Sequence, residues 1–152
     1  MKWNRQDRPD SGSGPSPRQS LLHRLLGAKL ISVTFIHDFL ELTFEETGED
    51  GHLIDSPRLD CLVWPKAVTA THSLTFGAPG YRDALCECIG ATVTLVRDDP
   101  SSGMQLHFDD RILEIRPTLD ELPGPEIALL HFFETKEWDV WRPGEDTFVD
   151  LV

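Results

Sequence analysis

The chain has 152 residues, of which 39% are apolar and 26% charged, and this composition is typical of a single globular domain with a buried core. Its apolar runs are too short to span a bilayer and its N-terminus lacks the apolar stretch of a signal peptide, so we expect a cytoplasmic protein with no membrane role. The net charge is −12, divided between +2 on residues 1–20 and −14 on the rest. An acidic body repels nucleic acid phosphates, which disfavours a nucleic acid partner, and attracts a basic protein.

A short helix is expected at the start of the folded region. We place this single α+β domain at residues 17–152, after a disordered tail at residues 1–16 that is rich in Gly, Ser and Pro. Residues 16–19 form a helix-capping signature, and leucines at helical spacing follow them. The helix should end at Gly27, because helices commonly close on a glycine in the left-handed conformation.

Runs of β-branched, aromatic and alternating apolar residues predict strands in both halves of the chain. In the first half, strands are expected at residues 30–36, 40–45, 53–54 and 59–64, with a possible short strand at 72–76. A second amphipathic helix should run from Tyr81 to Gly90. After it, strands are expected at residues 93–96, 104–109 and 112–115, followed by C-terminal strands within 125–142. Two readings stay open near the end. Residues 127–133 form a strand or a helical turn leading into one, and the last eight residues are an edge strand or a tail.

The two halves resemble each other. Leu26-Gly27-Ala28 recurs 63 residues later as Ile89-Gly90-Ala91, and residues 40–45 match residues 104–109 at an offset of 64. Residues 62–65 align with residues 114–117 after an insertion in the first half. Chance similarity is the alternative, because helix, glycine and strand often follow one another. We favour a true duplication because the elements recur in the same order at a nearly constant offset.

The expected architecture follows from this duplication. Repeat one spans residues 17–65 and repeat two spans residues 80–117, each being a helix–strand–hairpin unit. We therefore expect an α+β fold with mainly antiparallel sheet and two short helices packed on it. The sheet is either continuous or divided into two halves, related in both cases by a pseudo-two-fold axis.

No cofactor or metal site is expected. The three cysteines are an odd number in a chain without a signal peptide, which indicates reduced thiols. Cys86 and Cys88 are two residues apart on the predicted helix, so they point to different sides of it and cannot share a metal ion. We expect Cys88 to be buried. The acidic clusters lack the alternating ligand pattern of a calcium loop, and hydrated turn charges are the favoured interpretation.

A few residues are candidates for binding. His37 and Asp38 form a dyad in a turn, and His107 lies on the outward phase of its strand, so these residues would meet only if the two sheets join. Trp138 and Trp141 have opposite phases on a strand, so one of them is expected to be exposed and to mark a contact surface. We take Trp141 as the candidate. No catalytic constellation is recognisable, and an enzyme is disfavoured.

Several segments carry a resemblance to known proteins. Residues 26–44, Val63-Trp64-Pro65, residues 79–85 and Ile89-Gly90 resemble small uncharacterised bacterial proteins classed as domains of unknown function, over about residues 20–142. The resemblance implies a bacterial cytosolic origin and a fold, but no activity and no functional residue. In size and charge the chain is also similar to the small acidic immunity proteins of bacterial toxin systems.

These observations lead to two functional hypotheses. The first is a non-enzymatic binding protein, for example an immunity-type inhibitor that covers a basic partner with its acidic hairpins. The second is a small-molecule-binding protein or small enzyme with a pocket between the two repeats. The sequence does not decide the oligomeric state.

Overall fold

The computed structural model describes residues 20–99 and 102–143. The expected tail, the helix-capping signature at residues 16–19 and the last eight residues lie outside this range. In the described residues, mainly antiparallel strands form two separate sheets, accompanied by short helices. The expectation of mostly antiparallel sheet is confirmed, and of the two sheet arrangements the divided one is observed.

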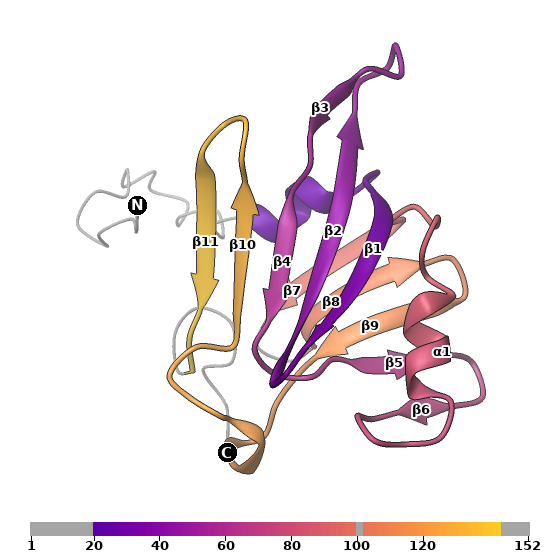
Figure 1. The fold of residues 1–152 in the computed structure, drawn as a ribbon, viewed down its shortest axis with the longest axis vertical. Coiled ribbons are helices and arrows are strands. Elements are labelled where there is room, and N and C mark those ends of the chain that lie inside the picture. The colour runs from indigo at the N-terminus through magenta and orange to yellow at the C-terminus, as the bar shows by residue number, and fades with distance from the viewer. Residues whose placement is uncertain (1–19, 100–101, 144–152) are drawn as a thin grey trace, which may run out of the picture.

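The first sheet has the strand order β1-β2-β4-β10-β11, and β3 pairs with the far end of β2 (Figure 1). Its strands are β1 (Lys29–Ile36), β2 (Phe39–Thr47), β3 (Leu53–Asp55), β4 (Arg58–Cys61), β10 (Ala128–Phe132) and β11 (Glu137–Trp141). The second sheet has the order β6-β5-β9-β8-β7. Its strands are β5 (Lys66–Val68), β6 (Ser73–Leu74), β7 (Leu95–Asp99), β8 (Gly103–Phe108) and β9 (Arg111–Ile115).

Alternating apolar residues on the strands form the core between the two sheets. Leu40, Leu42 and Phe44 of β2 are at most 1% exposed, and the residues between them face outward. β8 repeats the pattern with Met104, Leu106 and Phe108. Each such side chain contributes about 1.5–3 kcal/mol when it leaves water. The core is therefore the principal source of stability, as expected for a chain without disulfide bonds.

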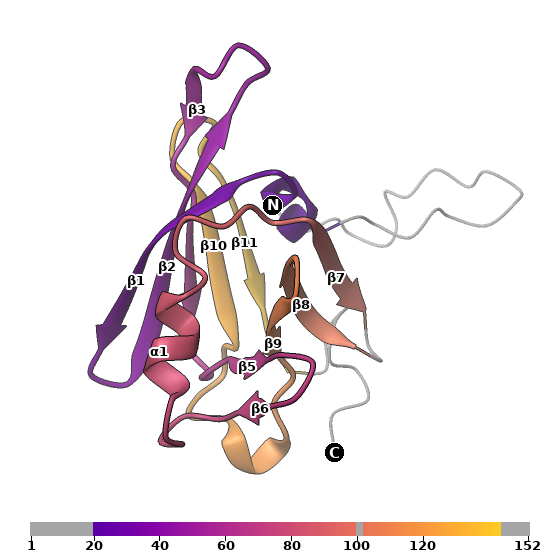
Figure 2. The same ribbon diagram turned by 90° about the vertical axis from the view of Figure 1, so that its right-hand side faces the viewer.

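Each sheet contains strands from both halves of the chain. After β4 the chain leaves the first sheet, and the hairpin of β5 and β6 joins the second sheet by pairing with β9. After β9 the chain returns, and the hairpin of β10 and β11 joins the first sheet by pairing with β4. The two hairpins are thus exchanged between the halves (Figures 1 and 2). Sequence analysis placed neither hairpin in a repeat, and it missed β5.

Backbone hydrogen bonds join the two halves directly at their glycines. The N–H of Gly27 donates to Val93 over 2.9 Å, and the N–H of Gly90 donates to Leu30 over 2.7 Å. The N–H of Leu30 donates to Ala91 over 3.0 Å, and that of Val93 donates to Ala28 over 2.8 Å. Both glycines have positive φ, +84° and +92°. Each glycine therefore ends its helical segment and turns the chain into this shared ladder.

The helices are shorter than the sequence pattern predicts. The first, η2 (Leu21–Leu25), is a 3₁₀ helix, and the second, α1 (Tyr81–Cys86), is an α-helix of six residues. A further 3₁₀ turn, η3 (Leu119–Glu121), lies between β9 and β10. Leu22 and Leu25 of η2 and Leu85 of α1 are fully buried, so the predicted apolar faces are the ones that pack. The tertiary contacts of such short helices decide their length, because isolated helices of this size are unstable in water.

Candidate functional site

The predicted site residues do not converge. His37 and Asp38 are exposed in the turn between β1 and β2 of the first sheet. His107 lies on β8 of the second sheet, on its outward face, where its Nε2 is 2.9 Å from Oε1 of Gln105. Partial burial lowers the pKa of His107, and the nearby positive charge of Arg97 lowers it further. The His37–Asp38 dyad and His107 therefore belong to different sheets and form no common site.

The two tryptophans of β11 have opposite environments, as their spacing predicts. Trp138 is 54% exposed and Trp141 is only 5% exposed. The indole N–H of Trp141 donates to Oδ2 of Asp98 on β7 over 2.9 Å, so this residue ties the two sheets together. The choice of Trp141 as the surface residue is thus corrected by its burial, and Trp138 occupies the exposed position.

The space between the sheets is filled. Leu42 and Leu59 from the first sheet and Met104 and Leu106 from the second line a void of about 10 Å³, which is room for at most one water molecule. A shallow hollow of about 350 Å³ lies instead on the surface beside α1, lined by Phe76, Tyr81, Arg82 and Asp83 among others. A ligand pocket between the two halves of the chain finds no support in this packing.

The buried cysteines are not poised for chemistry. Burial raises the pKa of the Cys88 thiol to about 11 and raises that of Cys61 even further. Cys86 is exposed, so it lies on the opposite side from Cys88, as the helical spacing predicts. Within residues 20–99 and 102–143, no three His, Cys, Asp or Glu side chains are grouped so that they could hold a metal ion.

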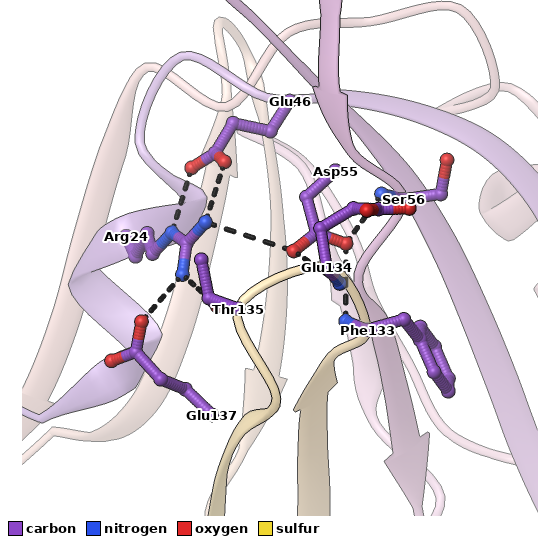
Figure 3. Close-up of polar contacts among 8 residues, drawn as sticks. All are labelled: Arg24, Glu46, Asp55, Ser56, Phe133, Glu134, Thr135 and Glu137. Atoms are coloured by element: carbon purple, nitrogen blue, oxygen red, sulfur yellow. Dashed lines mark hydrogen bonds and ion pairs between the residues drawn. The ribbon is translucent and has the colours of Figure 1, made fainter.

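A buried carboxylate organises one end of the first sheet. Asp55, the last residue of β3, is 1% exposed, and it is the one buried charged residue of the described chain. Its Oδ1 accepts backbone N–H groups from Ser56 at 2.8 Å and Phe133 at 3.1 Å, and its Oδ2 accepts that of Glu134 at 3.1 Å (Figure 3). Burying a charge is costly unless such bonds compensate it. Asp55 therefore fixes β3 to the turn between β10 and β11.

Arg24 of η2 completes the network from the other side. Its guanidinium binds both carboxylate oxygens of Glu46 at 2.8 and 2.9 Å and lies 3.7 Å from Oδ2 of Asp55. Its Nη1 also donates to Thr135 and Glu137, and its carbon lies 3.9 Å from the centre of the Phe132 ring. The hydrogen bonds to Glu46 raise the pKa of Arg24. Four separate segments thus meet at one guanidinium (Figure 3).

This network is a structural clamp. The donors of Arg24 and the oxygens of Asp55 are used in bonds within the protein, which leaves little capacity to bind substrate or transfer a proton. Its effect is to hold the projecting β2–β3 hairpin beside the β10–β11 turn. The chemistry available at this end therefore belongs to the side chains that the clamp presents to solvent.

Those side chains are apolar and acidic. Leu53, Ile54, Phe133 and Trp138 are between 48% and 58% exposed. Residues 47–54 and 133–138 carry four carboxylates against one lysine. The four carboxylates are Glu49, Asp50, Glu134 and Glu137. We call these four apolar residues and four carboxylates the hairpin–turn surface. Exposed aromatic residues beside charges are typical of the energetically dominant part of protein interfaces.

Sequence reasoning missed the clamp because its members are far apart in the chain. Arg24 lies within the leucine stripe, and Asp55 stands alone between an apolar pair and Ser56-Pro57. A lone acid at the end of a strand is a weak signal. The acidic character of the β2–β3 turn and the likely value of an exposed tryptophan on β11 were visible in the sequence, but their proximity depends on the exchanged hairpin.

Comparison with protein-family models, with curated proteins and with solved structures finds no match to this chain. In the described residues, no helix is long and apolar enough to cross a membrane.

Proposed function

We propose that this chain is a non-enzymatic protein-binding protein that uses the hairpin–turn surface to hold a basic partner. The observation that carries the proposal is the clamp, in which Asp55 and Arg24 fix two loops so that exposed apolar residues and carboxylates stand together. Preorganised loops lose little entropy on binding. The carboxylates would attract a basic partner, and Phe133 and Trp138 would supply most of the affinity.

An immunity-type inhibitor of a basic toxin is the form of this function that we favour. The acidic hairpin projects beyond the body of the molecule, where it can reach into a partner (Figures 1 and 2). The surrounding chain is acidic as well, which accelerates association with a basic protein at low salt. A cytoplasmic protein of bacterial origin is the setting that we propose for this role.

Replacing both Phe133 and Trp138 by Ala should abolish capture of a basic partner and leave the fold intact. The test is affinity capture at low salt from a bacterial lysate, with the full chain and the double variant as baits. Truncation of a dominant interface residue costs about 2 kcal/mol or more, or about thirtyfold in Kd, for each aromatic side chain. The matched control is Leu95→Ala, which removes a side chain that is 42% exposed on the other sheet.

The outcome is read from species that salt releases. A basic protein retained by the wild type and by Leu95→Ala, but lost from the double variant, is the expected result. Equal retention by all three baits would place binding elsewhere and would contradict the proposal. Recovery of no basic protein by the wild type would also count against it.

We further propose that the two halves are a tandem duplication, extended by the hairpins that they exchange. The hydrogen bonds of the central ladder come in pairs related by the same offset of 63 residues, for example Gly27 to Val93 and Gly90 to Leu30. The strand registers agree as well, since Val33 faces Leu42 as Val96 faces Leu106. For β4 and β9, Cys61 faces Leu40 as Ile115 faces Met104, which favours an offset of 54 over the 52 expected from sequence.

The duplication also singles out the hairpin–turn surface. In the second half, β8 and β9 are joined by the tight turn at Asp109–Asp110, whereas in the first half β2 and β4 are separated by the long hairpin that contains β3. Asp55 and the exposed Leu53 and Ile54 all belong to this extension. An element that only one of two related halves carries is not needed for the shared fold, and this supports a role in binding.

Substituting Ala at Gly27 and at Gly90 should cost nearly the same stability if the glycines are equivalent. Both have positive φ and no atom within 4 Å of an added Cβ, so strain of the left-handed backbone is the expected cost, about 1–2 kcal/mol. Gly124→Ala is the matched control, because that site is also open but its φ is not positive. Urea unfolding of the three variants measures the difference. A large cost at one of the paired glycines only would argue against equivalent roles.

A further inference from the structure

The exchanged hairpins make each half of the chain incomplete without the other. In the half formed by residues 20–74, the inner edge of β4 is covered by β10, which comes from the other half. In the half formed by residues 81–143, the inner edge of β9 is covered by β5. The central ladder and the clamp add further bonds between the same two halves. An unpaired strand edge is a template for pairing with another chain.

The covalent tie between the halves is a short exposed connection. It runs from Thr75 to Gly80, between the end of β6 and the start of α1. Gly77 and Gly80 have φ of +87° and +85°, and an added Cβ at Gly77 would meet nothing within 4 Å. Phe76 holds the connection against the body by stacking on Trp64 with the ring centres 4.2 Å apart. The noncovalent contacts between the halves do not depend on this segment.

We infer that a second copy of this chain can replace one half of the first, giving a dimer in which β10 of each copy pairs with β4 of the other. The exchanged dimer keeps every contact between the halves and changes only the path of residues 75–80. Closed monomer and exchanged dimer then differ mainly in the strain of this connection and in the entropy of association. Shortening the connection should therefore favour the dimer, since three residues span the gap less easily than six.

The test asks which chain supplies β10. Asp60 on β4 and Leu129 on β10 stand opposite each other and are partly exposed on the outward face, so thiols placed there can be joined by a short bis-maleimide. One chain carries Asp60→Cys and the other carries Leu129→Cys, both with Cys86→Ser to remove the exposed native thiol. The two chains are unfolded together, refolded as an equimolar mixture, cross-linked and separated under denaturing conditions.

With residues 77–79 deleted from both chains, we expect a covalent product at twice the 17.2 kDa chain mass. The matched control is deletion of residues 49–51 from the β2–β3 hairpin, which shortens a loop within one half and should give no such product. Full-length chains should give the product in a yield that rises with the protein concentration during refolding.

The inference is overturned if the shortened chains fold but yield no product between the two variants. Folding is verified with a single chain that carries both cysteines, which must then cross-link internally. A dimer by light scattering whose thiols join only within one chain would also overturn it, because that dimer would use another surface. If the shortened chain does not fold, the full-length mixture decides, and absence of the product at the highest refolding concentration is the negative result.

Discussion

Replacing Asp55 by Ala should lower the free energy of unfolding by about 3 kcal/mol. The change leaves the N–H groups of Ser56, Phe133 and Glu134 without their acceptor and removes one of the carboxylates around Arg24. A buried donor that loses its partner costs about 1–3 kcal/mol, partly offset here by entry of water. Urea unfolding followed by tryptophan fluorescence gives the value.

Asp50→Ala is the control for this prediction. Asp50 lies on the same hairpin and accepts a backbone N–H from His52 at 3.1 Å, but its side chain is 70% exposed. Its loss should change the unfolding free energy by less than about 0.5 kcal/mol. If the two variants were equally stable, the clamp would have no structural role. In that case the argument for a preorganised surface would fail with it.

A second large effect is expected from Leu130→Ala, at about 2–5 kcal/mol. Leu130 is fully buried on β10, opposite Leu59 of β4, and its truncation leaves a cavity in the core. Because β10 completes a sheet built mostly from the first half, hydrogen exchange should accelerate in β4 as well as in β10. Leu129→Ala, at the neighbouring half-buried position on the outward face, is the control and should cost less than about 1 kcal/mol. Protection retained in β4 while β10 opens would show that the hairpin unfolds independently.

The strands of this fold could be predicted from the sequence because they alternate. The pattern of Leu40, Leu42 and Phe44 predicts the face that is buried in the structure, and the two glycines predict where the helical segments end. The short strand β5 was missed because Lys66–Val68 is too brief to show a period. The helices were predicted too long, since apolar spacing reports the buried face and not the number of turns that packing supports.

The candidate site was only partly predictable, because it depends on contacts between distant segments. Arg24, Asp55 and Glu137 come from three elements that are adjacent only after the β10–β11 hairpin has crossed to the first sheet. Local patterns carry no information about that crossing. For the same reason Trp141 was taken as the surface residue. Its phase shows that it differs from Trp138, but the side of the sheet that faces the core depends on which strand covers β4.

The crossing of the two hairpins also determines the order in which a ribosome can deliver a finished fold. When β4 leaves the exit tunnel, the strand that covers its inner edge is still to be synthesised, because β10 begins 67 residues after Cys61. The β5–β6 hairpin likewise waits for β9. Nascent chains therefore expose two unpaired edges until late in synthesis, and long-range pairing of this kind is slow to form. Pausing of translation after β9, or crowding of neighbouring ribosomes on one message, would lengthen the time during which these edges can meet another chain.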